Sequence, residues 1–120
     1  MRKTCLKCVR KHLGTAAAYI NEIMQGYPNL DIFAIGELTH ASLECLLLYP
    51  DLAWAIREHR IRWSLTQDGK NPHIIPFEAI NDYLHVLEQA NAPVAIPDEV
   101  LDGLPRNEAG EVVYSMDTRP

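Results

Sequence analysis

Long hydrophobic runs are missing from this sequence. Uninterrupted apolar runs such as Leu46 to Tyr49 are far too short to span a bilayer. No apolar segment follows the basic start of the chain, as a secretory signal peptide would require. We therefore expect a soluble protein with no membrane partner.

Common catalytic signatures are missing as well. The sequence contains no Gly-x-Ser-x-Gly motif around a nucleophile and no glycine-rich phosphate loop. Cys5 and Cys8 form a Cys-x-x-Cys pair, but no βαβ pattern surrounds them, which argues against a thioredoxin-like redox protein. We expect a protein that is not an enzyme and that has no small-molecule substrate.

Cysteine is scarce, with 3 residues in a chain of 120. An odd number of cysteines without a signal peptide fits reduced thiols or metal ligands better than a disulfide framework. The length and the apolar content of 48% indicate one small domain. The net charge is -5, yet all charged residues before Glu22 are basic, and most of the charged residues in 93–120 are acidic. Oppositely charged ends permit head-to-tail contacts between copies of the chain.

Apolar residues recur at helical spacing in four stretches of the chain. They predict helices over residues 4–25, 32–48, 52–65 and 76–89, with Thr4 and Asp31 as N-caps of the first two. Glycine suits the left-handed position after a helix and proline cannot continue one, so Gly26 and Pro28 should end the first helix. The first break is short, which predicts an antiparallel helical hairpin. The fold class we expect is all-α, a small bundle of about four helices beginning with that hairpin.

Each predicted helix has an apolar stripe that we expect to be buried. In the third helix this stripe includes Leu52, Ala55, Ile56 and His59. The stripes of the first two helices consist of Leu6, Val9, Leu13, Ala16, Ala17, Ile20 and Met24, and of Ala34, Leu38, Ala41, Cys45 and Leu48.

The composition changes near residue 93. Pro93, Pro97 and Pro105 interrupt any regular structure, and residues 112–114 have an extended pattern. We therefore expect a helical domain over residues 1–92 and an extended, acidic C-terminal arm over residues 93–120. Such an arm buries little surface on its own domain, so it should lie on a partner, for example by adding a strand to a neighbouring sheet.

The densest group of chemically active residues is Cys5-x-x-Cys8-x-x-x-His12. On a helix these three residues fall within about 60° of one another, so all three side chains can face one ion. Thiolate and imidazole favour zinc over magnesium or calcium. This pattern predicts a structural zinc site. The alternative interpretation is that the cysteines are small buried apolar residues and His12 lies on the surface.

A fourth zinc ligand has to come from another part of the chain. Antiparallel pairing around residues 26–30 should bring His12 level with Glu44 and Cys45. Cys45 is the softer ligand, so we predict zinc bound by Cys5, Cys8, His12 and Cys45. Glu44 and His40 remain alternatives, and His40 suits a position that orients a ligand.

A second polar group, Glu37-x-x-His40-x-x-x-Glu44, also lies on one face of a predicted helix. Its Glu-x-x-His part is half of the motif of di-iron carboxylate bundles, but the chain has no second copy. The alternative is a solvated polar stripe on an amphipathic helix.

Two basic groups raise the possibility of a nucleic-acid partner. They precede residue 12 and lie at Arg57, Arg60 and Arg62 near Trp63. No helix-turn-helix spacing or finger pattern accompanies them, and charged helix faces are commonly solvated. A nucleic-acid partner is therefore not favoured.

The order of motifs in residues 5–62 resembles that of small uncharacterised proteins of tailed bacteriophages and prophages. The shared motifs are Cys-x-x-Cys-x-Arg-Lys-His-Leu, Gly26-Tyr27-Pro28, Ala34-Ile35-Gly36-Glu37-Leu38-x-His40-Ala41, Tyr49-Pro50 and Ile56-Arg57-x-x-Arg60. The resemblance implies a phage origin and a cysteine-bearing helical hairpin. It supplies no catalytic role and no ligand set.

With the phage origin that the resemblance implies, we expect a non-enzymatic structural component of a bacteriophage particle, in its head, neck or tail. Its partners would be other virion proteins and copies of itself, and it would be located in the virion after synthesis in the host bacterial cytoplasm. The alternative is a small zinc-binding phage regulator or nucleic-acid-associated protein that works through the basic first and third helices.

Overall fold

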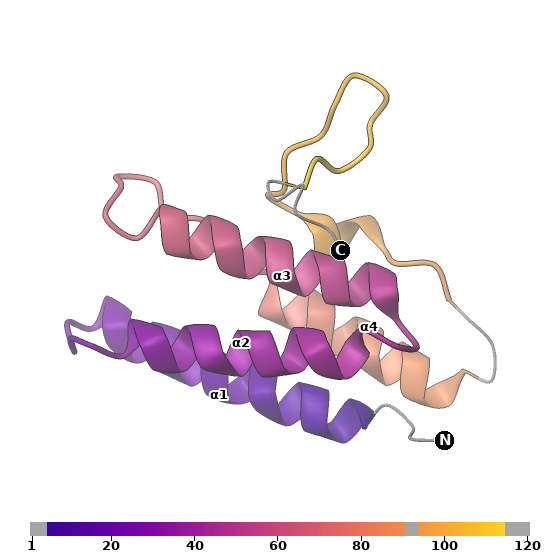
Figure 1. Ribbon diagram of the computed structural model, residues 1–120, viewed down its shortest axis with the longest axis horizontal. Coiled ribbons are helices and arrows are strands. Elements are labelled where there is room, and N and C mark those ends of the chain that lie inside the picture. Colours follow the sequence, from indigo (N-terminus) through magenta and orange to yellow (C-terminus); the bar gives the residue numbers. More distant parts are fainter. Residues whose placement is uncertain (1–4, 91–93, 115–120) are drawn as a thin grey trace.

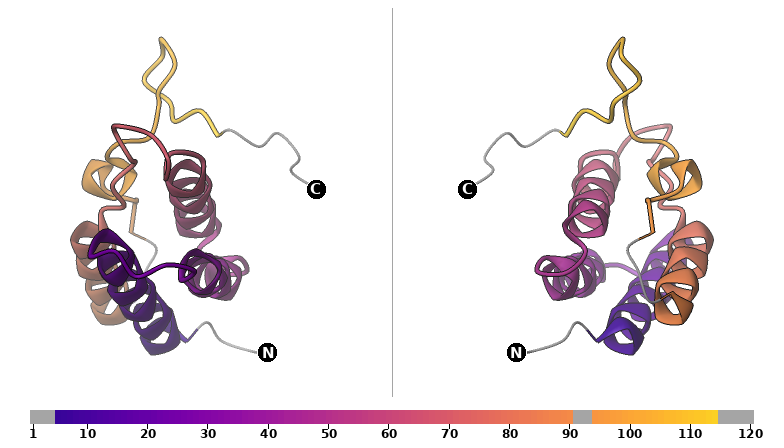
Figure 2. Two further views of the ribbon diagram at one scale, coloured as in Figure 1. Left: turned by 90° about the vertical axis from the view of Figure 1, so that its left-hand side faces the viewer. Right: turned by 90° about the vertical axis from the view of Figure 1, so that its right-hand side faces the viewer.

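The computed structural model describes residues 5–90 and 94–114. These residues form helices α1 (Leu6–Met24), α2 (Asp31–Cys45), α3 (Pro50–Leu65) and α4 (Phe77–Gln89), followed by the short 3-10 helix η1 (Asp98–Leu101). Viewed end-on, the four long helices form an arc in the order α4, α1, α2 and α3 (Figure 2). The all-α fold and the antiparallel α1–α2 hairpin predicted from the sequence are confirmed.

The ends of α1 have identifiable local causes. Cys5 is the N-cap, and its sulfur accepts a hydrogen bond from the Cys8 N–H. Thr4, the predicted N-cap, lies outside the described residues. At the other end Gly26 has φ +102°, and the N–H groups of Gly26 and Tyr27 donate to the carbonyls of Ile23 and Glu22. Gly26 therefore ends α1 in the left-handed conformation expected of it.

One continuous core lies inside the arc of helices. Its largest fully buried apolar side chains come from every long helix and from η1, and they include Val9, Leu38, Leu52, Ile56, Ile80, Leu84 and Val100. The short helix η1 lies at the open side of the arc, between α3 and α4 (Figure 2). Ile75 and Val100 belong to the same core. Segments far apart in the sequence thus complete one core.

The second helix is shorter than its sequence pattern predicts. It ends at Cys45 rather than at Leu48, and the side chain of Leu48 is 48% exposed. Pro50 begins α3, and a residue that precedes proline is pushed out of the helical conformation. The prediction of Leu48 as a core residue is wrong, because the chain leaves α2 three residues before Leu48. Met24, predicted at the end of the α1 stripe, is 81% exposed.

The first part of the predicted C-terminal arm packs against the helices. Val100 is fully buried and Leu104 is 6% exposed. The Tyr83 hydroxyl donates a hydrogen bond to the Val94 carbonyl, which fixes this segment beside α4. The structure here differs from the interpretation that the arm leaves the domain at residue 93. Prolines interrupt its secondary structure without preventing its apolar side chains from packing.

Residues 105–114 form a loop that extends away from the helices (Figure 1). An isolated antiparallel bridge joins Arg106 to Val112, and the Arg106 guanidinium donates to the Gly110 carbonyl. The Tyr114 ring lies 5.9 Å from the Trp54 ring on α3. Among the described residues no helix has both the length and the apolar character needed to cross a membrane.

Candidate metal centre

Two contacts fix how α1 and α2 lie side by side. The Cys5 N–H donates to Glu44 Oε1 at 3.4 Å, and His12 Nδ1 donates to Glu37 Oε2 at 2.6 Å. Seven residues separate Cys5 from His12, and seven separate Glu37 from Glu44, so the two helices run antiparallel with a constant register. The polar residues along this contact form what we call the α1–α2 seam: Cys5, His12, Glu37, His40 and Glu44.

The residues of α2 predicted to lie opposite His12 are wrong. The sequence pattern placed it opposite Glu44 and Cys45, whereas in the structure it lies opposite Glu37. The prediction assumed that both helices meet symmetrically at residues 26–30. Instead the Tyr19 ring stacks on the Phe33 ring at 5.7 Å, so α2 begins alongside the last turns of α1 rather than beyond them.

Three side chains of the seam come together as a candidate metal site. One nitrogen each of His12 and His40 and one oxygen of Glu37 all lie within 4.8 Å of one another. The two imidazole rings are 5.2 Å apart and nearly perpendicular. His12 and Glu37 are about one-third exposed, and His40 is exposed. An ion could therefore reach the site from solvent without a change in the core.

The donor set suits zinc. Zinc binds imidazole nitrogen and carboxylate oxygen at about 2.1 Å, so tetrahedral ligand atoms are about 3.4 Å apart. The ligand atoms of His12, Glu37 and His40 lie within 4.8 Å of one another, so small side-chain rotations can bring them to that spacing. Glu37 can serve as a ligand, or it can orient His12 through Nδ1 while Nε2 binds the ion. The first arrangement leaves one of the four positions open, and the second leaves two.

Two of the predicted cysteine ligands are bonded to each other. Cys5 and Cys8 form a disulfide across the N-terminus of α1. The expectation of reduced thiols is therefore wrong for this pair in this structure, because the two cysteines are adjacent on the first turn and face each other. A disulfide sulfur is not a thiolate and is a poor zinc ligand.

The third predicted cysteine ligand lies in the core. Cys45 is a free thiol with no exposed surface. Burial, and secondly the charge of Glu44, raises the pKa of Cys45 to about 12, which disfavours the thiolate that zinc requires. Of the predicted set Cys5, Cys8, His12 and Cys45, the structure brings only His12 into the candidate metal site.

A second histidine pair lies at the opposite side of the bundle and was not identified from the sequence. His59 on α3 has no exposed surface, and its Nε2 donates to the Val100 carbonyl at 2.7 Å. Its Nδ1 is therefore the acceptor for His73 Nε2, at 2.8 Å. Glu58, which is 2% exposed, accepts a hydrogen bond from Arg62 beside this pair.

Burial lowers the pKa of His59 to about 4, with the hydrogen bond to Val100 opposing the shift. Burial and the charge of Arg62 also lower the pKa of His73. The neutral forms are the ones that the hydrogen bonds require. Gly103 has φ +87°, and a Cβ atom there would come within 3.1 Å of His73. The pair thus joins α3, the loop before α4 and the C-terminal segment, and its nitrogens are used for structure.

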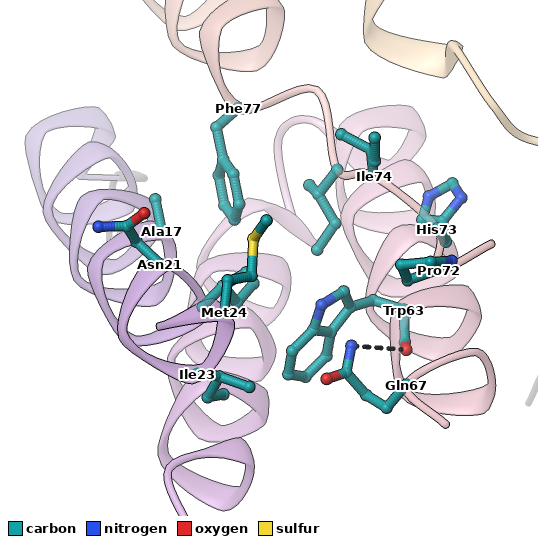
Figure 3. Close-up of a pocket in the computed structure, with 12 residues that line it drawn as sticks. Ala17, Asn21, Ile23, Met24, Trp63, Gln67, Pro72, His73, Ile74 and Phe77 are labelled. Carbon is teal, nitrogen blue, oxygen red and sulfur yellow. Dashed lines mark hydrogen bonds between the residues drawn. The ribbon is translucent and has the colours of Figure 1, made fainter. Parts of the chain in front are cut away.

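Apolar residues also remain exposed around a groove of about 490 Å³ between α1, the end of α3 and residues 72–77. Figure 3 shows Trp63, Met24 and Phe77 facing this groove. Two of the basic residues are engaged elsewhere: Arg10 pairs with Glu88, and Arg57 lies over the Trp54 ring. A groove of this kind suits an apolar partner better than a phosphate backbone.

Comparison with known protein families, with curated proteins and with solved structures finds no match for this chain.

Proposed function

We propose that this protein is a non-enzymatic structural component of a bacteriophage particle. It would act through protein–protein contacts, with a zinc ion bound at His12, Glu37 and His40 that joins the α1–α2 hairpin. The virion origin rests on the resemblance of the sequence motifs, and the mode of action rests on the surface and on the seam.

The observation that carries the proposed mode of action is a cluster of exposed leucines at the end of α2. They are between 48% and 72% exposed, and we call them the leucine patch: Leu43, Leu46, Leu47 and Leu48. Clustered exposed apolar side chains are typical of protein interaction sites. Leu43 and Leu46 also line a hollow of about 280 Å³ with Trp54. This surface favours a protein partner that buries it.

Zinc would make the partner-binding surface more rigid. The α1–α2 contact bears polar side chains along its seam, and one ion bound by both helices would hold the middle of α2, at Glu37 and His40, against α1. Binding energy at such a site adds to folding free energy, which is small for a domain of this size. The leucine patch begins three residues after His40, at the C-terminal end of α2, and would then be presented on a fixed helix.

The test is mass spectrometry of purified native particles from the source phage. The proposal predicts a stoichiometric amount of the chain in the particle. Leu47→Glu should reduce incorporation strongly while the free protein stays folded, because a charge at the contact would have to be desolvated. Val86→Glu on α4, a side chain that is also half exposed, is the matched control and should be incorporated normally. Absence of the wild-type chain from particles would contradict the proposed function.

A further inference from the structure

We infer that Cys8 is a redox-controlled ligand of the candidate zinc site: reduction of the Cys5–Cys8 disulfide releases a thiolate that fills the open fourth position beside His12 and His40. This inference rests on the proposed zinc binding at the α1–α2 seam. It adds a regulatory input, the oxidation state of the cysteine pair, that the three-residue site alone does not have.

The register of the seam places Cys8 opposite Ala41, one residue from the level of His40. Cys5 lies opposite Glu44 and His12 lies opposite Glu37. Cys8 lies between Cys5 and His12 on α1, so its level on α2 is between Glu37 and Glu44, where His40 and Ala41 are. The sulfur of Cys8 is therefore attached at the level of the site rather than beyond it.

The helix geometry also brings Cys8 under His12. Residues four apart on a helix lie about 40° apart around its axis and one turn apart along it. Side chains of a helix lean toward its N-terminus, so a histidine covers the turn that precedes it. His12 thus lies over the turn that carries Cys8. Rotation of the freed Cys8 side chain about its Cα–Cβ bond is the movement that the inference requires.

Cys5 is a poorer candidate for the same position. It is seven residues from His12, which is about two helical turns or 10 Å along the axis. It is also the N-cap of α1, and its N–H group is bonded to Glu44. After reduction of the disulfide, Cys5 would still lie at the end of the seam, away from His12 and His40. The structure therefore assigns the ligand role to Cys8.

The disulfide is open to a reductant, because Cys8 is exposed and Cys5 is half-buried. A dithiol supplies two electrons: one of its thiolates attacks a sulfur of the Cys5–Cys8 bond, and its second thiol closes the reagent into a cyclic disulfide. Cys5 and Cys8 each leave as a thiol after taking one proton. Zinc then displaces the Cys8 proton to solvent and forms a zinc–sulfur bond. No other oxidant or reductant is needed.

The soft character of the thiolate explains why reduction of the disulfide would change zinc affinity. Thiolate is a stronger zinc ligand than the water that otherwise occupies the fourth position. The reduced chain would hold zinc with two nitrogens, one sulfur and Glu37 or water, whereas the disulfide form would rely on the His12, Glu37 and His40 group alone. Reduction therefore tightens the site and oxidation weakens it.

The experiment compares zinc affinity of the full chain with the disulfide intact and after reduction by a dithiol that is then removed under nitrogen. Competition with a coloured zinc chelator gives both affinities. We expect at least tenfold tighter binding by the reduced chain. Cobalt(II) should show thiolate-to-metal charge-transfer absorption only in the reduced form. Equal zinc affinities of the two forms, or a reduced cobalt complex without that absorption, would overturn the inference.

Variants separate this inference from the proposed zinc site itself. Cys8→Ser prevents the disulfide and removes the ligand, so dithiol treatment should leave its affinity at the level of the oxidised wild type. Cys5→Ser also prevents the disulfide but keeps Cys8, and it should bind tightly without reduction. Zinc binding that needs His40 but ignores the redox state would overturn only the role of Cys8. Loss of binding by both forms of the wild type would overturn the zinc site as well.

Discussion

The two histidine clusters of this protein use the same side chain in opposite ways. His12 and His40 lie on the partly exposed α1–α2 seam, where the Glu37 carboxylate accepts a hydrogen bond from His12. His59 and His73 lie at the opposite side of the bundle, where both nitrogens of His59 are engaged. In the first cluster, imidazole nitrogens are placed where they can bind a ligand. In the second, the two nitrogens of His59 form hydrogen bonds that join three segments of the chain.

Burial decides between these two roles. A buried imidazole must satisfy its donor and its acceptor within the protein. Its hydrogen bonds therefore hold together the segments that carry its partners. An exposed imidazole can exchange water for a metal ion at little cost. Removing a histidine should therefore affect folding in one cluster and metal binding in the other.

The largest expected effect is that of His59→Ala. It leaves a cavity and removes the partners of the Val100 carbonyl and of His73, which should lower the free energy of unfolding by about 3 kcal/mol or more. Urea denaturation measures this loss. His85→Ala on the exposed side of α4 is the matched control and should cost less than about 0.5 kcal/mol. Equal small losses for both variants would show that the buried pair is not a structural contact.

Acid should weaken the buried cluster next. The pKa of His59 is about 4 in the folded chain and 6.5 when unperturbed, so the unfolded state binds the proton first as the pH falls. Stability is therefore lost as the pH falls from about 6.5 toward 4, by about 3 kcal/mol from His59 alone. Urea midpoints at several pH values measure this slope, to which paired carboxylates also contribute. His59→Gln should be less steep than wild type over this range, and an unchanged slope would refute the assignment.

Zinc should stabilise the exposed cluster by a comparable but smaller amount. Free zinc at a hundred times its dissociation constant adds about 2.7 kcal/mol to the free energy of unfolding. Thermal denaturation with and without zinc measures the effect. His40→Ala should lose this response and keep the metal-free stability of the wild type. A response that persists in His40→Ala would place the zinc elsewhere.

The smallest expected effect on folding is that of Glu37→Gln. The His12–Glu37 pair is about one-third exposed, so its loss should cost less than about 1 kcal/mol. Zinc affinity should nevertheless fall about tenfold or more, because Glu37 binds the ion or orients His12. Urea denaturation and chelator competition measure the two quantities separately. A large loss of stability with unchanged affinity would reverse the roles given to the two clusters.

Local patterns of the sequence predicted the helices well. The spacing of Leu52, Ile56 and His59 identified the buried face of α3, and Gly26 identified the end of α1. These features depend on neighbours a few residues apart. His12 was predicted as a metal ligand, and Glu37 and His40 as a polar group, from their spacing on single helices, and all three lie in the candidate metal site.

Contacts between distant segments were not predictable in the same way. The helix pattern does not determine the register of α1 against α2, so His12 was matched with Glu44 instead of Glu37. His73 lies in a turn-rich stretch without periodicity, and nothing in its neighbourhood pointed to His59. Val100 was assigned to the C-terminal arm, because a single buried residue between prolines produces no helical or strand periodicity in the sequence.

The most direct test of this account is the zinc content of the wild-type chain and of His12→Ala/His40→Ala, measured by native mass spectrometry after purification with zinc. The account predicts one zinc ion per wild-type chain and none in the double variant, with both chains folded. A wild-type chain without zinc, or a double variant that retains one ion, would contradict the metal site at the α1–α2 seam.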